Sequence, residues 1–193
     1  DERNSLVGSE MCIRDSPRVM YLPSQQRFEY QAVSQLKLSY HFATKVNTSQ
    51  ILGNAEFFIK EYILGLERKS TIADPQARTK SAIDQFNAHF LQADMLTSLV
   101  DLSANDFNRP VFENATGERV NIDQLSDGEK QLYARVIALM MLEPRNSVIL
   151  IDEPEIALHP AWQQKIMPIY ASIGENNQFI VVTHSPQVIR SVP

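Results

Sequence analysis

The chain has 193 residues, of which 44% are hydrophobic, 21% charged and 8% aromatic, and this apolar content supports one packed core and excludes general disorder. Its 18 Lys and Arg residues stand against 23 Asp and Glu residues, and the net charge of −5 excludes a global basic field that would attract nucleic acid. The apolar runs are far shorter than the ~20 residues of a membrane-spanning helix, and the single cysteine, Cys12, fits a reducing compartment, so we expect a soluble cytoplasmic protein with no membrane partner.

Both ends of the chain are predicted to be cut. Residues 1–16 show neither helical nor alternating periodicity, and they resemble translated sequencing-adapter read-through from the ends of environmental gene fragments. We therefore expect this segment to be a non-native artefact, and the native protein to begin upstream of Pro17. Residues 189–193 stop partway through a predicted helix, which predicts truncation at that end as well.

Residues 17–105 are predicted to form a short strand, a loop and a helical insert subdomain. The strand covers residues 18–22 and is closed by a Pro-Ser pair. Residues 50–66 and 77–91 repeat apolar side chains every three or four positions, which predicts two amphipathic helices. His89 falls off the apolar face of the second helix, and we expect it to be solvated.

The insert also carries basic side chains that a nucleic acid could contact. Because the chain has no net positive charge, a solvated helix face is the favoured interpretation of these residues. They are Lys60, Arg68, Lys69, Arg78 and Lys80.

The remaining residues, 106–193, are predicted to form the core of an α/β domain. A hairpin with strands at 106–113 and 118–122 comes first. The elements expected after it are a helix (126–141), a strand (148–151), a helix (160–173) and a strand (179–183). This alternation predicts a parallel sheet covered on both faces, with its functional loops at the carboxyl ends of the strands.

The start of the helix at residue 126 allows two interpretations. In the sequence LSDGEKQ, Ser126 and Glu129 are three residues apart, as in a capping box. The same hydroxyl, together with the unobstructed amide of Gly128 at a helix N-terminus, is suited to the terminal phosphate of a nucleotide. The segments that follow decide between these interpretations.

Two apolar strands end in polar residues that suit phosphate chemistry. VILI is followed by Asp152, which can hold Mg²⁺, and by Glu153, which can polarise an attacking water. FIVV is followed by Thr183 and His184, and His184 can donate a hydrogen bond to a γ-phosphate. Acids at strand ends often only meet solvent, but two acids directly behind four apolar residues and ahead of a proline favour the functional interpretation.

The order and spacing of these segments resemble the ATPase core of the ATP-binding-cassette (ABC) superfamily over about residues 107–190. LSDGEKQ resembles its signature, VILIDE its Walker B motif, EIALHP its D-loop region and VVTHS its histidine switch. The resemblance implies ATP and Mg²⁺ as cofactors. The roles it implies are contact with ATP held by a second protomer for Ser126, Gly128 and Glu129, Mg²⁺ binding for Asp152, the catalytic base for Glu153 and the γ-phosphate sensor for His184.

The sequence departs from the ABC family pattern in two places. None of the six glycines is followed by Lys, so the G-x-x-x-x-G-K-[ST] phosphate loop (Walker A) is missing and the chain cannot complete its own ATP site. The D-loop carries His159 and Pro160 where transporter ATPases usually have Asp. The form DEPExxLHP resembles the branch that includes overcoming-lysogenization-defect (OLD) nucleases, RecF-like and SMC-like ATPases and phage-defence ATPases. Gln25 or Gln26 stands near the position of the glutamine loop of that branch.

The favoured hypothesis is therefore a fragment of a soluble ABC-type ATPase of this branch. Its expected fold is α/β, a P-loop NTPase-like parallel sheet flanked by helices, with a helical insert subdomain and an N-terminal lobe that lacks Walker A. In the full-length protein, ATP would be bound and hydrolysed in a head-to-tail homodimer that drives or gates an effector of the DNA-repair or phage-defence type. DNA and a nuclease domain or subunit are the candidate partners, and the fragment alone is expected to be inactive.

Two alternatives stay open. The chain can be the nucleotide-binding subunit of a membrane transporter, although the long separation between Arg27 and Leu125 and the His-Pro D-loop argue against this. It can also be a non-hydrolysing, ATP-dependent switch module, and here the intact Glu153 argues against the alternative.

Overall fold

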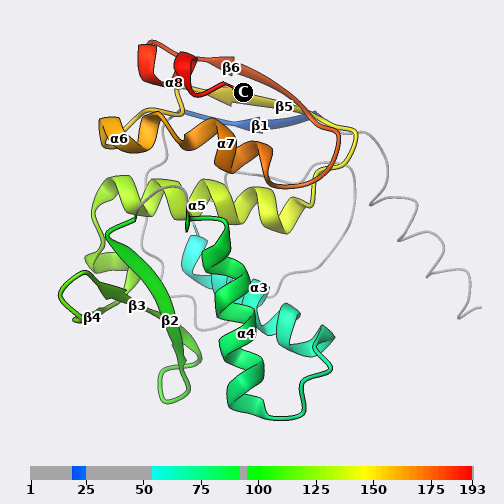
Figure 1. Cartoon of the computed structure of the whole chain (residues 1–193), viewed down its shortest axis with the longest axis vertical. Coiled ribbons are helices and arrows are strands. Elements are labelled where there is room, and N and C mark those ends of the chain that lie inside the picture. The colour runs from blue at the N-terminus through cyan, green and yellow to red at the C-terminus, as the bar shows by residue number, and fades with distance from the viewer. Residues whose placement is uncertain (1–18, 25–53, 92–94, 193) are drawn as a thin grey trace, which may run out of the picture.

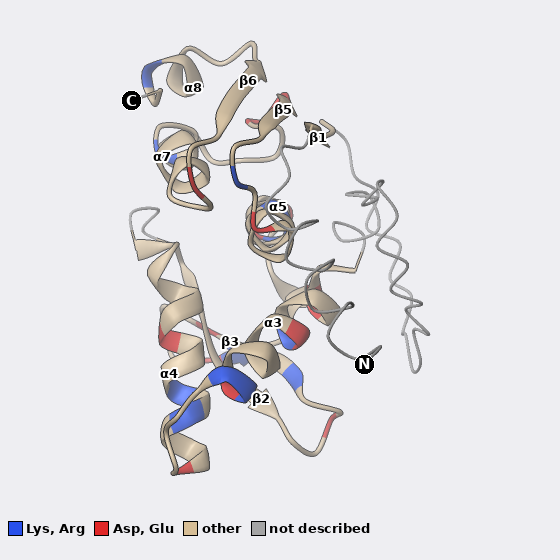
Figure 2. Cartoon of the chain, turned by 90° about the vertical axis from the view of Figure 1, so that its right-hand side faces the viewer, with Lys and Arg blue, Asp and Glu red and all other residues tan. Residues whose placement is uncertain are grey.

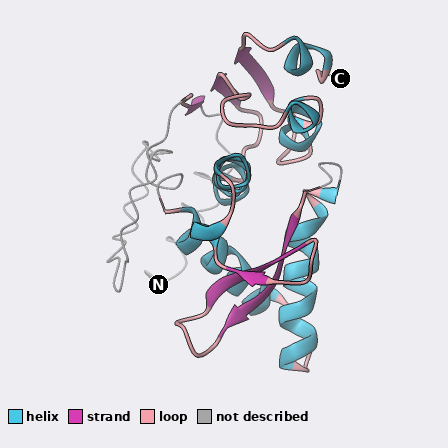
Figure 3. Ribbon diagram, turned by 90° about the vertical axis from the view of Figure 1, so that its left-hand side faces the viewer, coloured by secondary structure: helices cyan, strands magenta, loops and turns pink. Residues whose placement is uncertain are grey.

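A computed structural model describes residues 19–24, 54–91 and 95–192. A long helix, α5 (Asp127–Leu142), runs through the middle of this part of the chain. Figure 1 shows a parallel sheet on one side of α5 and an antiparallel sheet with two helices on the other, and Figure 3 shows the same arrangement with α5 seen end-on. No described helix is both long enough and apolar enough to cross a membrane.

The parallel sheet has the strand order β1-β5-β6. Its strands are β1 (Val19–Leu22), β5 (Val148–Asp152) and β6 (Gln178–Val182), which confirms the three strands predicted here. Two short helices, α6 (Pro160–Gln163) and α7 (Ile166–Ala171), lie on the α5 side of this sheet, and a third, α8 (Pro186–Arg190), lies beside β6. Parallel pairing brings the carboxyl ends of β5 and β6 together, with Asp152 opposite Val182.

The two faces of the parallel sheet differ in exposure. Side chains on the face toward α5 are buried, among them Met20, Leu22, Ile149 and Ile151. On the other face Val19 is 73% exposed and Val182 57% exposed. Cover on both faces was the expectation from the continuous apolar runs, whereas helices cover only one face within the ranges that the structure describes.

The predicted helix over residues 160–173 is divided into α6 and α7. Pro168 explains the division, because a proline ring clashes with the carbonyl of the residue four positions earlier, here Gln164. The chain therefore leaves the helical path between Gln163 and Ile166. The apolar side chains that recur at helical spacing across this segment are nevertheless all buried: Trp162, Ile166, Ile169, Tyr170 and Ile173.

The insert contains a strand as well as the two predicted helices. The helices are α3 (Ala55–Lys69) and α4 (Pro75–Ala88), and the antiparallel sheet has the order β2-β3-β4, with β2 (Thr97–Ser103), β3 (Arg109–Asn114) and β4 (Arg119–Val120). A short 3₁₀ helix, η2 (Ile122–Gln124), leads into α5. The hairpin of β3 and β4 is confirmed.

The sequence analysis did not predict strand β2, because this strand is irregular. Its register with β3 shifts between Leu99 and Asp101, so its apolar residues do not alternate strictly. Since β2 pairs with β3, one sheet spans the boundary expected between residues 105 and 106.

The insert and α5 share one aromatic cluster. The rings of Phe86, Phe90 and Phe112 lie 6.1, 4.7 and 4.9 Å from the ring of Tyr133, measured between centroids. The Tyr133 hydroxyl also donates to the backbone carbonyl of Thr97 at 2.8 Å. Aromatic pairs of this kind add to the stabilisation from buried area. The antiparallel sheet therefore fixes the rotation of α5, on whose first turn the predicted signature residues lie.

Candidate active site

Glu153 and His184 meet at the carboxyl edge of the parallel sheet. The backbone amide of Glu153 donates to the carbonyl of Val182 at 2.8 Å, which extends the pairing of β5 and β6 by one residue. Oε1 of Glu153 lies 3.8 Å from Nε2 of His184. The His184 side chain is 86% exposed and that of Glu153 33% exposed, so both are open to a ligand. The structure thus brings together the two residues that the sequence nominated for catalysis.

Asp152 occupies the same edge but belongs to the exposed face of the sheet. The hydroxyl of Tyr21 donates to its Oδ2 at 3.4 Å. Desolvation and the Asp152 carboxylate raise the pKa of Tyr21, so the hydroxyl stays protonated and available as a donor. Sequence analysis missed Tyr21, since its proximity to Asp152 follows from the pairing of β1 with β5.

The loop that connects β5 to α6 has an unusual backbone. Glu153 has φ 44° and Ala157 has φ 63°, the left-handed region that non-glycine residues seldom adopt. Such conformations cost about 1–3 kcal/mol each and are found preferentially at functional sites. The turn at Glu153 directs the chain away from the sheet directly after the strand, so the carboxylate lies at the sheet edge.

The start of α5 is a complete capping box. Oγ of Ser126 accepts from the amide of Glu129 at 3.3 Å, and the Glu129 carboxylate accepts from the Ser126 amide at 3.1 Å and its hydroxyl at 2.7 Å. The other carboxylate oxygen of Glu129 accepts from the Thr97 hydroxyl at 2.7 Å. Glu129 is only 4% exposed. It holds Ser126 in place from inside the protein, and its predicted contact with ATP stays a prediction.

Gly128 is enclosed by the loop that follows Glu153. A Cβ atom at residue 128 would lie 2.5 Å from the carbonyl oxygen of Ala157 and 3.3 Å from the Trp162 ring. Only a glycine fits this contact without a shift of the backbone. The contact places the start of α5, the predicted signature, beside the predicted D-loop region. Among the described residues no hydrogen bond or ion pair joins Ser126 to Glu153 or His184 of the same chain.

Gly128→Ala is expected to destabilise the protein by about 1–3 kcal/mol, the usual cost of overpacking against a rigid neighbour. Gly65 is the matched control, because it lies inside α3 and a Cβ atom added there would meet nothing within 4 Å. Gly65→Ala should therefore stabilise the protein by up to about 1 kcal/mol. Urea denaturation of both variants measures the difference in the free energy of unfolding. A Gly128→Ala variant as stable as the wild type would contradict this expectation, because it would show that the loop at Ala157 can move aside without loss of stability.

A buried arginine ties the active-site edge to α5. Arg135 is 1% exposed, and its guanidinium donates to the carbonyls of Ser24 at 3.1 Å and of Pro23 and Glu153 at 3.5 Å. A buried guanidinium is costly unless its donors find acceptors. Arg135 thereby anchors the ends of both β1 and β5. The only sequence signal for it is a charged residue in the apolar middle of a helix.

The basic side chains of the insert are mixed with acids in α3 and α4, as Figure 2 shows. Arg78 donates to the carbonyls of Ile72 at 2.9 Å and Ala73 at 3.1 Å, and Arg68 lies 3.9 Å from Glu61. These local contacts agree with a solvated helix face.

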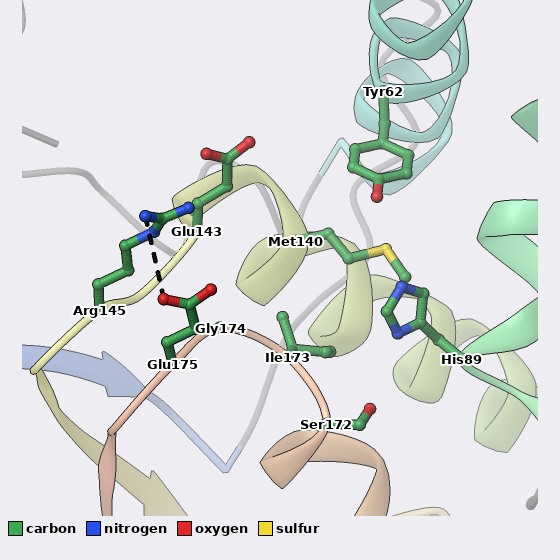
Figure 4. A pocket seen from close by; sticks show the side chains of 9 residues that line it. All are labelled: Tyr62, His89, Met140, Glu143, Arg145, Ser172, Ile173, Gly174 and Glu175. Carbon is green, nitrogen blue, oxygen red and sulfur yellow. Dashed lines mark ion pairs between the residues drawn. The ribbon is translucent and has the colours of Figure 1, made fainter. Parts of the chain in front are cut away.

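A separate cavity of about 240 Å³ opens near the C-terminal end of α5 and the segment before β6, away from the carboxyl edge. Figure 4 shows His89, Tyr62 and Glu143 around it, and Arg145 paired with Glu175 at 4.0 Å. His89 is half-buried here, so the expectation of a solvated side chain is wrong. Burial lowers its pKa. The helix ends at Ala88, and the turn that follows brings the ring inward.

A parallel sheet with helices on one face, and with acids and a histidine at the carboxyl ends of its strands, is an α/β arrangement. Residues 13–190 match the family described as "AAA domain, putative AbiEii toxin, Type IV TA system". This match covers most of the chain, and the chain belongs to that family of AAA-type ATPase domains.

Curated relatives share parts of this domain. The retron Ec83 probable ATPase of Escherichia coli is 30% identical over 148 residues, which are 64% of this chain and 27% of that protein. The retron Vc95 probable ATPase of Vibrio cholerae is 41% identical over 87 residues, 39% of this chain and 17% of that protein. The chromosome partition protein Smc of Mycoplasma genitalium is 34% identical over 76 residues, 38% of this chain and 8% of that protein. The chain thus spans about a quarter or less of each of these relatives.

Two solved structures of SMC proteins also resemble the chain. An Smc head bound to the C-terminal winged-helix domain of ScpA has a TM-score of 0.46 at 19% identity, covering 72% of this chain and 48% of that one. A structure from a study of ATP-driven dimerisation and DNA-stimulated activation of SMC ATPases has a TM-score of 0.43 at 23% identity, covering 59% of this chain and 74% of that one.

Proposed function

We propose that this chain is part of an ABC-type ATPase in which each ATP is bound between two copies of a head-to-tail homodimer. The observation that carries the proposal is the meeting of Glu153 and His184, 3.8 Å apart, on neighbouring strand ends. Glu153 can activate a water molecule, and His184 beside it can donate a hydrogen bond to a phosphate oxygen. This pair of groups suits phosphoryl transfer to water. Membership of an AAA-type ATPase family supports ATP as the substrate.

In this proposal each residue at the sheet edge has a separate role in ATP hydrolysis. Glu153 accepts a proton from the attacking water, and His184 donates a hydrogen bond to the γ-phosphate. Asp152 binds Mg²⁺, which neutralises negative charge on the phosphates when bound. The described residues contain no cluster of three or more metal-ligating side chains. One carboxylate oxygen fits Mg²⁺ well, because this ion takes most of its remaining ligands from nucleotide phosphates and water.

The start of α5 serves the ATP of the other protomer in this proposal. Ser126 and the amide of Gly128 contact the γ-phosphate, at a helix N-terminus that favours anions. Glu129 belongs to the same site and acts by orienting Ser126, because its carboxylate accepts from the Ser126 amide at 3.1 Å and from its hydroxyl at 2.7 Å. In this proposal the hydroxyl proton turns from Glu129 to a phosphate oxygen when ATP binds. The packing of Gly128 against the D-loop at Ala157 supports a coupling between the signature of one site and the base of the other.

We further propose that ATP binding and hydrolysis gate an attached effector in the cytoplasm, of the OLD-like DNA-repair or phage-defence type, with DNA or a nuclease as partner. The likeness to retron ATPases and to a chromosome partition protein supports this over a transporter subunit. The missing phosphate loop is supplied, in this proposal, by sequence outside these 193 residues. The chain together with that segment and the effector is called the full-length protein below.

The 193-residue chain alone is expected to hydrolyse no ATP, because it has no lysine-bearing phosphate loop. The full-length protein is expected to release phosphate from ATP in a Mg²⁺-dependent manner. A phosphate-release assay on both proteins tests this. Turnover by the 193-residue chain above a buffer blank, abolished by Glu153→Gln and so not a contaminant, would contradict the proposal.

A further inference from the structure

The turn that carries His184 is held by a carboxylate from the neighbouring loop. Oε2 of Glu155 accepts from the hydroxyl of Thr183 at 2.7 Å, and Oε1 accepts from the backbone amide of His184 at 2.7 Å. Both oxygens of one half-buried carboxylate are therefore used on two successive residues. Charge-assisted hydrogen bonds of this length are among the stronger ones in proteins.

These bonds continue into a network that spans the turn. The amide of Ser185 donates to the Thr183 hydroxyl oxygen at 3.0 Å, and the Ser185 hydroxyl donates to Oε1 of Gln163 in α6 at 2.6 Å. Ser185 also caps the first turn of α8. The segment from Thr183 to Ser185 is thus fixed at both ends by residues that follow Glu153 in the chain.

The His184 ring itself has little packing to hold it, since its side chain is 86% exposed. Its position relative to Glu153 therefore depends on where the backbone of the turn lies. Burial alone would raise the pKa of Glu155, but hydrogen bonds from Thr183 and the backbone amides of the turn lower it, so the carboxylate is ionised at neutral pH.

We propose that Glu155 is a positioning residue. It fixes the turn that carries His184, so that the His184 ring lies close to Glu153 and within hydrogen-bonding distance of the γ-phosphate. This inference rests on the proposed ATPase function. It gives a role to the third acid of the DEPE sequence, which in this proposal does not itself touch the substrate. Ionised Glu155 accepts both hydrogen bonds without a competing donor, so it holds one geometry of the turn.

Variants of Glu155 in the full-length protein separate positioning from folding. Glu155→Ala removes both acceptors and should lower kcat by ~10- to 100-fold, as loss of a supporting contact does, with little change in ATP affinity. Glu155→Gln should recover most of this loss, because its oxygen can accept from the His184 amide and its NH₂ can donate to the Thr183 oxygen. Glu175→Ala, which removes a 74% exposed carboxylate that pairs with Arg145 before β6, is the matched control.

Variants of Thr183, which donates to Glu155, give an independent test. Thr183→Val removes the hydroxyl, whereas Thr183→Ser keeps it, so only the first should lower kcat. Glu155→Ala and Thr183→Val both break the hydrogen bond between these side chains, and Thr183→Val also removes the acceptor of the Ser185 amide, so the loss of kcat in the double variant should be smaller than the product of the two single losses. Hydrogen exchange of the peptide over residues 183–185 should be faster in Glu155→Ala and unchanged in Glu155→Gln and Glu175→Ala. Urea denaturation of each variant monitors global stability.

Unchanged kcat and unchanged exchange in a folded Glu155→Ala variant would overturn the inference, while wild-type turnover would leave the proposed function intact. If Glu155→Ala does not fold, Thr183→Val with normal kcat overturns it instead. Absence of turnover in the wild type would overturn the proposed function and the positioning role together, and faster exchange in Glu155→Ala would then assign Glu155 a purely structural role.

Discussion

Glu153→Gln in the full-length protein is expected to lower kcat for ATP hydrolysis by at least ~10²-fold, the scale of losing a general base. Glutamine has nearly the same size, and the backbone at residue 153 is fixed by its hydrogen bond to Val182 at 2.8 Å. ATP binding should therefore stay intact, because the carboxylate acts on the water rather than on the nucleotide. Slow hydrolysis should also trap the ATP-bound dimer.

Single-turnover phosphate release and equilibrium ATP binding, measured on the same samples, separate these effects. Glu175→Gln is a suitable control. Glu175 lies before the amino end of β6, whereas Glu153 lies beside the carboxyl end of β6. Normal turnover in Glu153→Gln would mean that another group accepts the proton, and Asp152 would be the next residue to replace.

Ser126→Gly is expected to weaken ATP-dependent dimerisation by ~10²- to 10⁴-fold. A hydrogen bond to a charged group contributes about 1.5–3 kcal/mol, and the dimer has two equivalent sites. The folding cost is expected to be smaller, because glycine replaces serine at a helix N-cap at a cost of a few tenths of a kcal/mol, and loss of the hydroxyl's hydrogen bond to Glu129 adds about 1–2 kcal/mol. Aspartate is less suitable here, because Oε2 of Glu129 lies 2.7 Å from the Ser126 hydroxyl and would repel a second carboxylate.

Sedimentation with ATP and Mg²⁺ measures this effect, with Ser126→Thr as the control that keeps the hydroxyl. ATP binding to the monomer should be little altered in both variants. A normal dimer peak for Ser126→Gly would reduce the motif to the capping box seen in the structure.

The positions of the candidate site residues at one sheet edge could be predicted because each comes at the end of an apolar strand. Asp152, Glu153 and His184 need only the rule that parallel strands end at the same sheet edge. The Ser126 cap was likewise readable, since a capping box depends on four consecutive positions. Local patterns therefore predicted the elements that carry the candidate site.

Contacts made by the fold could not be read in the same way. Arg135 donates to main-chain carbonyls, so no complementary side chain marks it in the sequence. Glu155 accepts from a main-chain amide and from the hydroxyl of Thr183, which lies 28 residues further along the chain, so no local pattern marks this pair. The bulge in β2 hid a strand, and Pro168 divided a helix whose apolar periodicity continues across the break. Two predictions lie outside the described residues: the role of Gln25 or Gln26, and the non-native origin of residues 1–16.

The most direct test of the account is a structure of the full-length Glu153→Gln variant with ATP and Mg²⁺. The account predicts a dimer in which the γ-phosphate lies between Asp152 and His184 of one protomer and Ser126 and Gly128 of the other. Nucleotide bound away from the carboxyl edge of the parallel sheet, or bound there without contact from a second protomer, would contradict it.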